Sequence, residues 1–247
     1  MRALKLEAFF NEIPLATGTC FVVSITNELF IVTNKHNVTG KDPMTGELKD
    51  KKTGAVPNKL RIWFLTNSED LNGWKSIDVN THDHLGNPTW FEDENDSEAD
   101  VALLKLRPYG ITVSSTSLDR YSGLPKNQPG DIVHVIGFPF GQASLEHFPI
   151  WLTGFIATDL AIDYERKPCF LIDCRTRKGN SGSPVISFSG AKLDIFDSSG
   201  SLLQQVPEYN LLGIYSGRVN DESDLGKVWK LTYIHKLLKE ARKKLAL

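Results

Sequence analysis

Three short sequence patterns carry residues that together can perform acyl transfer. His36 lies in residues 33–38, after an apolar segment, Asp100 opens the apolar segment 101–104, and Ser181 lies in the glycine-rich segment 179–184. Each pattern is weak alone, because a histidine after a strand is usually structural and a Gly-x-Ser-Gly sequence is usually a turn. Together they supply a general base, an orienting carboxylate and a nucleophile, in that order along the chain.

The chemistry of a serine nucleophile explains why all three residue types are needed. A serine hydroxyl is a poor nucleophile near neutral pH, so Ser181 needs His36 to accept its proton, and His36 needs a buried carboxylate to fix its tautomer. Asp100 fits this role because it opens an alternating, buried segment. The competing acids lie in a polar run that is interpreted as a solvated loop: Glu92, Asp93, Glu94, Asp96 and Glu98.

β-strands are expected to position these residues. Segments rich in Val, Ile, Phe and Trp alternate in polarity between clusters of Gly, Pro and Asn, which is typical of antiparallel β-proteins. The predicted strands fall into two groups: residues 4–10, 19–25, 29–33, 60–65, 75–79 and 101–106, and then residues 131–137, 150–157, 168–174, 183–188, 211–215 and 228–232. The sequence therefore predicts an all-β fold of two six-stranded antiparallel β-barrels followed by one α-helix.

This grouping predicts how the chain is divided. Residues 1–113 form an N-terminal barrel carrying His36 and Asp100, residues 114–130 a connector rich in Ser, Pro, Gly and Asn, and residues 131–232 a C-terminal barrel carrying Ser181. Residues 233–247 are expected to form a docked helix. Its apolar residues recur at helical spacing: Ile234, Leu237, Leu238, Ala241 and Leu245.

The three motifs resemble those of the chymotrypsin-like (trypsin-like) serine peptidases. That superfamily carries a Thr-Ala-x-His turn, an Asp-[IV]-Ala-Leu-Leu strand and Gly-[DN]-Ser-Gly-[GS]-Pro, which the residues around His36, Asp100 and Ser181 resemble. Residues 179–184 look most like the bacterial glutamyl endopeptidases, and residues 137–141 are similar to a turn of the high-temperature-requirement peptidases. The resemblance implies a serine endopeptidase that acts on proteins or peptides in a cleft between the barrels, with His36, Asp100 and Ser181 as catalytic residues.

The residues around Ser181 also predict an oxyanion hole. Gly179 provides an unobstructed turn, so that its N–H and that of Ser181 can point together at the oxygen that becomes negative during acyl transfer. Secreted digestive relatives carry an Asp before the serine, which pairs with a new N-terminus after zymogen cleavage. Here that residue is Asn180. We therefore expect an oxyanion hole that forms without proteolytic activation.

The resemblance places substrate-binding residues as well. The residue six before the nucleophile lies near the base of the primary specificity pocket in this superfamily, and here it is Arg175. Ser216, Gly217 and Arg218 match the segment whose backbone pairs with the substrate, and Lys178 is expected beside them. A basic pocket at Arg175 predicts cleavage after Asp or Glu, and the alternative is that the charges of residues 175, 177 and 178 are solvated.

Composition limits the other function classes. The 247 residues contain 28 Lys+Arg and 30 Asp+Glu, a net charge of -2, so no general attraction to nucleic acid or anionic lipid is expected. Apolar runs are too short to span a membrane, and polar residues interrupt the position of a leader, so we expect a cytoplasmic protein.

Cysteine and histidine placement argues against metal or disulfide chemistry. Three cysteines, Cys20, Cys169 and Cys174, are expected to be reduced structural thiols. His82 and His84 have ligand spacing but no cysteine nearby, so no metal and no cofactor are predicted. The alternative function is a catalytically silent or gated module of the same fold that binds a peptide as an added strand.

Overall fold

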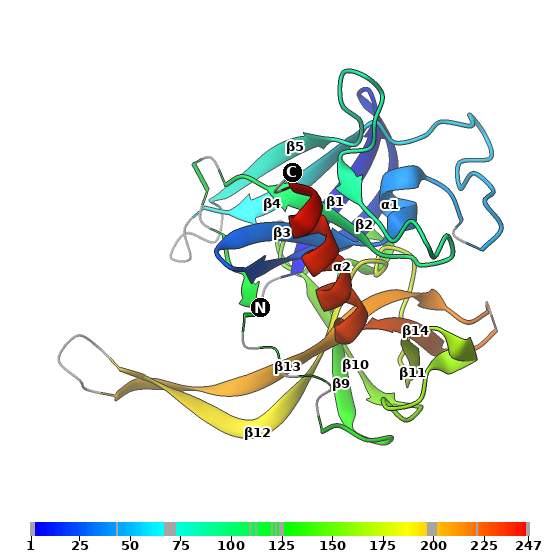
Figure 1. Cartoon of the computed structure of the whole chain (residues 1–247). Helices are drawn as coiled ribbons and strands as arrows, with labels where there is room; N and C mark the ends of the chain where they lie inside the picture. The colour runs from blue at the N-terminus through cyan, green and yellow to red at the C-terminus, as the bar shows by residue number, and fades with distance from the viewer. Residues whose placement is uncertain are drawn as a thin grey trace.

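The computed structural model describes residues 3–245 apart from residues 43, 67–72, 109, 112, 120, 122, 124–125, 197–201 and 221. For residues 191–196 and 202–207 it describes the backbone. Two β-structures follow one another along the chain, and helix α2 (Leu231–Leu245) lies across both of them (Figure 1). None of the helices in this part of the chain is both long and apolar enough to cross a bilayer.

The first β-structure, called the first sheet below, has eight strands in the order β5-β4-β1-β2-β3-β7-β6, with β8 pairing with β2. Strands β1 and β4 alternate between buried and partly exposed residues, whereas β2 has six and β3 four consecutive buried residues, because side chains on both faces of these two strands belong to a hydrophobic core. A short helix, α1 (Lys35–Thr39), follows β3. The strands are β1 (Ala3–Phe10), β2 (Ile13–Ile25), β3 (Glu28–Thr33), β4 (Lys59–Leu65), β5 (Trp74–Asn80), β6 (Trp90–Phe91), β7 (Ala102–Leu106) and β8 (Thr116–Ser117).

The second β-structure is a closed six-stranded antiparallel barrel in the order β10-β11-β14-β13-β12-β9. Strands β12 and β13 run on beyond the barrel as a two-stranded ribbon (Figure 1). Two 3-10 turns, η1 (Pro139–Gly141) and η2 (Tyr164–Arg166), lie in its loops. The strands are β9 (Ile132–Gly137), β10 (Ile150–Ile156), β11 (Cys169–Asp173), β12 (Pro184–Phe196), β13 (Leu202–Arg218) and β14 (Leu225–Lys230).

The all-β class, the second barrel and the C-terminal helix are confirmed, and each predicted strand overlaps an observed one. The first β-structure differs from the predicted six-stranded antiparallel barrel: in the described residues it is an eight-stranded sheet that does not close, and β8 pairs with β2 in parallel. The additional strands β6 and β8 have only two residues each and give no alternating pattern to detect. Strand β8 lies inside the predicted connector, where Thr116 pairs in parallel with Val23 of β2. Helix α2 begins at Leu231, two residues before the predicted start.

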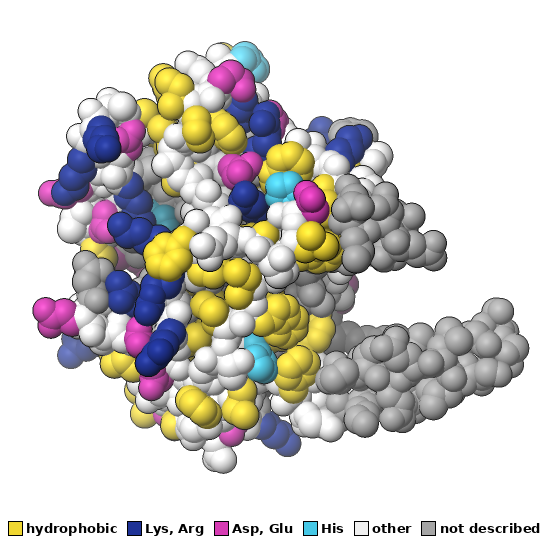
Figure 2. Space-filling model, turned by 180° about the vertical axis from the view of Figure 1, so that it is seen from behind, with side chains coloured by type: hydrophobic (Ala, Val, Ile, Leu, Met, Phe, Trp, Pro, Cys, Tyr) yellow, Lys and Arg dark blue, Asp and Glu magenta, His cyan; other side chains and the backbone are white. Residues whose placement is uncertain are grey.

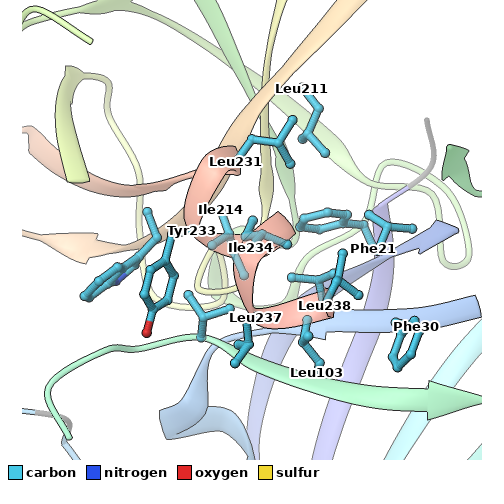
Figure 3. Packing of buried hydrophobic residues seen from close by; sticks show 14 of the residues in the cluster. Phe21, Phe30, Leu103, Leu211, Ile214, Leu231, Tyr233, Ile234, Leu237 and Leu238 are labelled. Atoms are coloured by element: carbon cyan, nitrogen blue, oxygen red, sulfur yellow. The ribbon is translucent and has the colours of Figure 1, made fainter. Parts of the chain in front are cut away.

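Helix α2 joins the two β-structures through a shared hydrophobic core. Its buried residues pack against Phe21, Phe30 and Leu103 of the first sheet and against Leu211 and Ile214 of β13 (Figure 3). The helix supplies Leu231, Tyr233, Ile234, Leu237 and Leu238 to this core. Each fully buried apolar side chain contributes about 1.5–3 kcal/mol relative to exposure. The helix therefore fixes the barrel relative to the first sheet, and with it the residues that face each other between them.

Candidate active site

His36 and Asp100 form a buried pair at one end of the first sheet. His36 lies in α1, just after β3, and Asp100 lies just before β7, the strand that pairs with β3. The His36 Nδ1–H donates to Asp100 Oδ2 at 2.8 Å, and the His36 backbone N–H donates to Asp100 Oδ1 at 2.9 Å. Because Nδ1 carries the proton toward the carboxylate, Nε2 of the neutral ring is left as an acceptor.

Two more residues hold Asp100 in place. Ser216 lies where the register of β13 against β14 shifts, and a bulge of this kind redirects a side chain. Its hydroxyl donates to Asp100 Oδ2 at 2.5 Å. Asn34 Nδ2 donates to the Asp100 backbone carbonyl at 2.7 Å. Asp100 is only 2% exposed, so the donors from His36 and Ser216 replace the water that its carboxylate loses on folding.

Ser181 lies in the turn between β11 and β12, in the second β-structure. Its hydroxyl donates a long bond of 3.4 Å to the carbonyl oxygen of Ser216. Within the described residues it makes no hydrogen bond with His36, although both side chains line the same cavity. The Ser181 carbonyl accepts the Thr19 backbone N–H at 2.9 Å and Asn37 Nδ2 at 3.3 Å. These two bonds tie the serine turn to β2 and α1 of the first sheet.

The backbone before Ser181 leaves two N–H donors unused. The Lys178 carbonyl accepts the N–H of Phe140, from the turn η1, at 2.6 Å. In a trans peptide the next N–H points the opposite way, so this bond turns the Gly179 N–H away from η1. Neither Gly179 N–H nor Ser181 N–H has a hydrogen-bond acceptor in the described part of the chain. The pair is therefore available to an external oxygen.

Gly179 and Asn180 explain why this turn keeps its shape. Gly179 has φ +96°, and a Cβ there would lie 2.1 Å from the carbonyl oxygen of Phe138, so only glycine fits. Oδ1 of the buried Asn180 side chain accepts a hydrogen bond from the Arg177 backbone N–H at 3.0 Å, and the Asn180 backbone N–H donates to the Arg177 carbonyl at 3.0 Å. Asn180 thus braces the turn locally.

A cavity of about 460 Å³ opens over these residues. His36, Asp100 and Ser181 line it, as do the residues 216–218 that the sequence assigned to substrate binding. Burial raises the pKa of Tyr215, which also lines the cavity, to about 12, against the opposing hydrogen bond from Thr176. The Tyr215 hydroxyl therefore stays protonated and adds no charge to the cavity.

Arg175 does not lie where the sequence placed it. Its side chain is 86% exposed, its Nε lies 3.7 Å from Asp224 Oδ2, and it does not line the cavity. The reason is that the backbone of residues 174–177 directs Thr176, not Arg175, inward, and Thr176 is fully buried against Tyr215. The side chain of Arg175 therefore does not form the base of this cavity.

Sequence reasoning missed several residues of the site. Thr19, Asn37 and Phe140 hold the serine turn, and Lys49 lines the cavity from the loop after α1. Thr19 lay in the predicted strand 19–25, Asn37 in the 33–38 motif and Phe140 in the 137–141 turn, but sequence reasoning assigned none of them this role. Lys49 lies in a polar stretch that looks like an ordinary loop. The described residues contain no group of three or more His, Cys, Asp or Glu that could hold a metal.

The architecture is that of the chymotrypsin-like serine peptidase superfamily. Residues 18–193 match the trypsin-like peptidase domain, and the chain belongs to that family of hydrolases.

Solved structures agree on the fold. The active form of the Rv3671c protease from M. tuberculosis superposes with a TM-score of 0.54 at 18% identity, covering 96% of this chain and 79% of that one. The inactive form gives 0.52 at 17% identity, covering 96% and 87%. The serine endoprotease from Yersinia pestis gives 0.51 at 16% identity, covering 97% and 62%.

Proposed function

We propose that this protein is a serine endopeptidase that hydrolyses peptide bonds of protein substrates through an acyl-enzyme. Ser181 is the nucleophile, His36 the general base and Asp100 the residue that orients His36. The observation that carries the proposal is the 2.8 Å bond from His36 Nδ1 to Asp100, in a cavity that Ser181 also lines, beside a serine turn with two unused backbone N–H donors.

The proposed reaction begins when the Ser181 hydroxyl turns from the Ser216 carbonyl toward His36 Nε2. Ser181 Oγ then bonds to the substrate carbonyl carbon as Nε2 takes its proton, and the resulting oxyanion accepts hydrogen bonds from the N–H groups of Gly179 and Ser181. The C–N bond breaks, and His36 gives the proton to the leaving amine. Water, deprotonated by His36, hydrolyses the acyl-enzyme and restores Ser181. No cofactor takes part in these steps.

Labelling with a fluorophosphonate probe tests the proposal, because the probe reacts only with an activated serine. We expect labelling of the natural chain and none of Ser181→Ala. Turnover should fall about 10⁶-fold in Ser181→Ala and in His36→Ala, and about 10⁴-fold in Asp100→Asn, since the three act as a unit. Equal turnover in Ser181→Ala contradicts the peptidase assignment. Full activity in Asp100→Asn contradicts the role of Asp100.

One observation favours a second candidate, a gated or silent peptide-recognition module. The Ser181 hydroxyl is bonded to Ser216 and not to His36 among the described residues. A chain that binds peptides in the cavity but never reacts with the probe would support this second function.

A further inference from the structure

The cavity around Ser181 is strongly basic, although the chain as a whole is slightly acidic. Its lining contains six cationic residues and three acidic ones. Figure 2 shows Lys and Arg side chains gathered around a hollow on this face. The acids are Asp42, Glu98 and Asp100, and the cations are Lys49, Lys167, Arg177, Lys178, Arg218 and Lys227. Both oxygens of Asp100 accept bonds from His36, and one also accepts a bond from Ser216.

Several of these cations are already neutralised by neighbours. Lys167 pairs with Glu98, Arg177 NH1 lies 3.2 Å from Asp224, and Lys227 lies 3.6 Å from Glu165. Lys49 and Lys178 differ from them. Neither has an ion-pair partner within 4.0 Å in the described part of the chain.

Lys49 and Lys178 reach the cavity from the two β-structures. Lys49 follows α1 in the first, and Lys178 immediately precedes Gly179 in the second. Desolvation lowers the pKa of Lys49; Asp100 and Asp42 oppose this, and the positive charge of Lys178 adds to it. The two ammonium groups therefore act on the same space. Both side chains are exposed, so an anion placed there would chiefly relieve their mutual repulsion.

We propose that this cavity selects peptide segments with an Asp or Glu side chain next to the bond to be cleaved, recognised by Lys49 and Lys178. The inference rests on the proposed function, because it treats the acidic segment as the substrate. Lys178 immediately precedes Gly179, whose N–H is the proposed donor to the carbonyl that would be attacked. An extended peptide advances about 3.3–3.6 Å per residue, so a lysine side chain reaches about two residues on either side of that carbonyl.

This assignment differs from a basic pocket at Arg175. The selection comes from the rim of the cavity on both sides of Ser181, where carboxylates exchange part of their hydration for charged partners. Because such pairs are partly exposed, the preference should weaken as salt is added. It should also fall when either lysine loses its charge.

Peptide binding to Ser181→Ala measures the preference without requiring turnover. Fluorescent peptides that differ only by Glu or Gln within two residues of one central bond are compared by anisotropy at low salt. We expect the Glu peptide to bind about 5–10-fold more tightly. Adding Lys49→Gln or Lys178→Gln should reduce that ratio about 3-fold each. The matched control is Lys243→Gln, because Lys243 is an exposed lysine of α2 that forms no ion pair within the described residues and does not line the cavity; this variant should leave the ratio unchanged.

Equal binding of the Glu and Gln peptides, a preference for Lys or Arg, or an unchanged ratio in both lysine variants would overturn the inference. Probe labelling of the natural chain separates this failure from failure of the proposed function. Labelling without acid preference keeps the peptidase and rejects the role of the two lysines. Acid preference without labelling keeps the role of the lysines and assigns it to a recognition module.

Discussion

Replacing Gly179 by alanine should remove oxyanion stabilisation while leaving the chain folded. The added Cβ would lie 2.1 Å from the carbonyl oxygen of Phe138 and 3.1 Å from the N of Gly141. Since such a carbon rarely approaches within about 3 Å of an oxygen, the turn must move by roughly 1 Å. Gly179 would also carry a side chain at φ +96°, which costs about 1–2 kcal/mol.

The effect on rate follows from that displacement. Loss of one oxyanion donor costs about 10²–10³-fold in kcat, and a 1 Å misplacement costs about 10²-fold. We therefore expect Gly179→Ala to lower kcat and the rate of probe labelling by about 10²–10³-fold, with KM nearly unchanged. The reason is that the lost hydrogen bond forms fully only in the transition state.

Gly130→Ala is the matched control. Gly130 has φ +91°, but nothing lies within 4 Å of a Cβ at that position, so the variant carries the backbone strain without the collision. Urea unfolding should show a loss of about 1–2 kcal/mol in Gly130→Ala with normal labelling. Labelling of Gly179→Ala within about 3-fold of the natural chain would show that its N–H is not an oxyanion donor. An equal rate loss in Gly130→Ala would assign the effect to stability.

Two further predictions concern titrating side chains. Desolvation and the nearby Lys5 lower the pKa of His147, so the unfolded chain binds the proton more readily, and stability should fall as pH drops through about 6.5. In urea unfolding, His147→Phe should lose less stability than the natural chain when the pH falls from about 7.5 to about 5.5. The control, His84→Gln at an exposed histidine, should lose as much stability as the natural chain. Equal loss in His147→Phe and the natural chain would contradict this prediction. Burial raises the pKa of all three free cysteine thiols, to about 12 for Cys169 and about 11 for Cys174. Native protein at about pH 8 should therefore resist iodoacetamide, and the cysteines should react only when the chain is unfolded. Alkylation of native protein, detected by mass spectrometry, would refute the burial of these thiols.

The positions of the strands could be read from the sequence because the signal is local. Alternating buried and exposed residues mark β1 and β9, and the helical spacing of Ile234, Leu237 and Leu238 marks α2. The motifs around His36 and Ser181 are equally local. The family could be predicted from them, since a short run of residues carries each.

Only the tertiary structure decided which residues meet. Ser216 reaches Asp100 because β13 bulges against β14, and Phe140 holds the Lys178 carbonyl because η1 packs behind the serine turn. Arg175 turns to solvent for a related reason: its neighbour Thr176 takes the inward position. Side-chain direction depends on contacts between segments far apart in sequence, which no local pattern encodes.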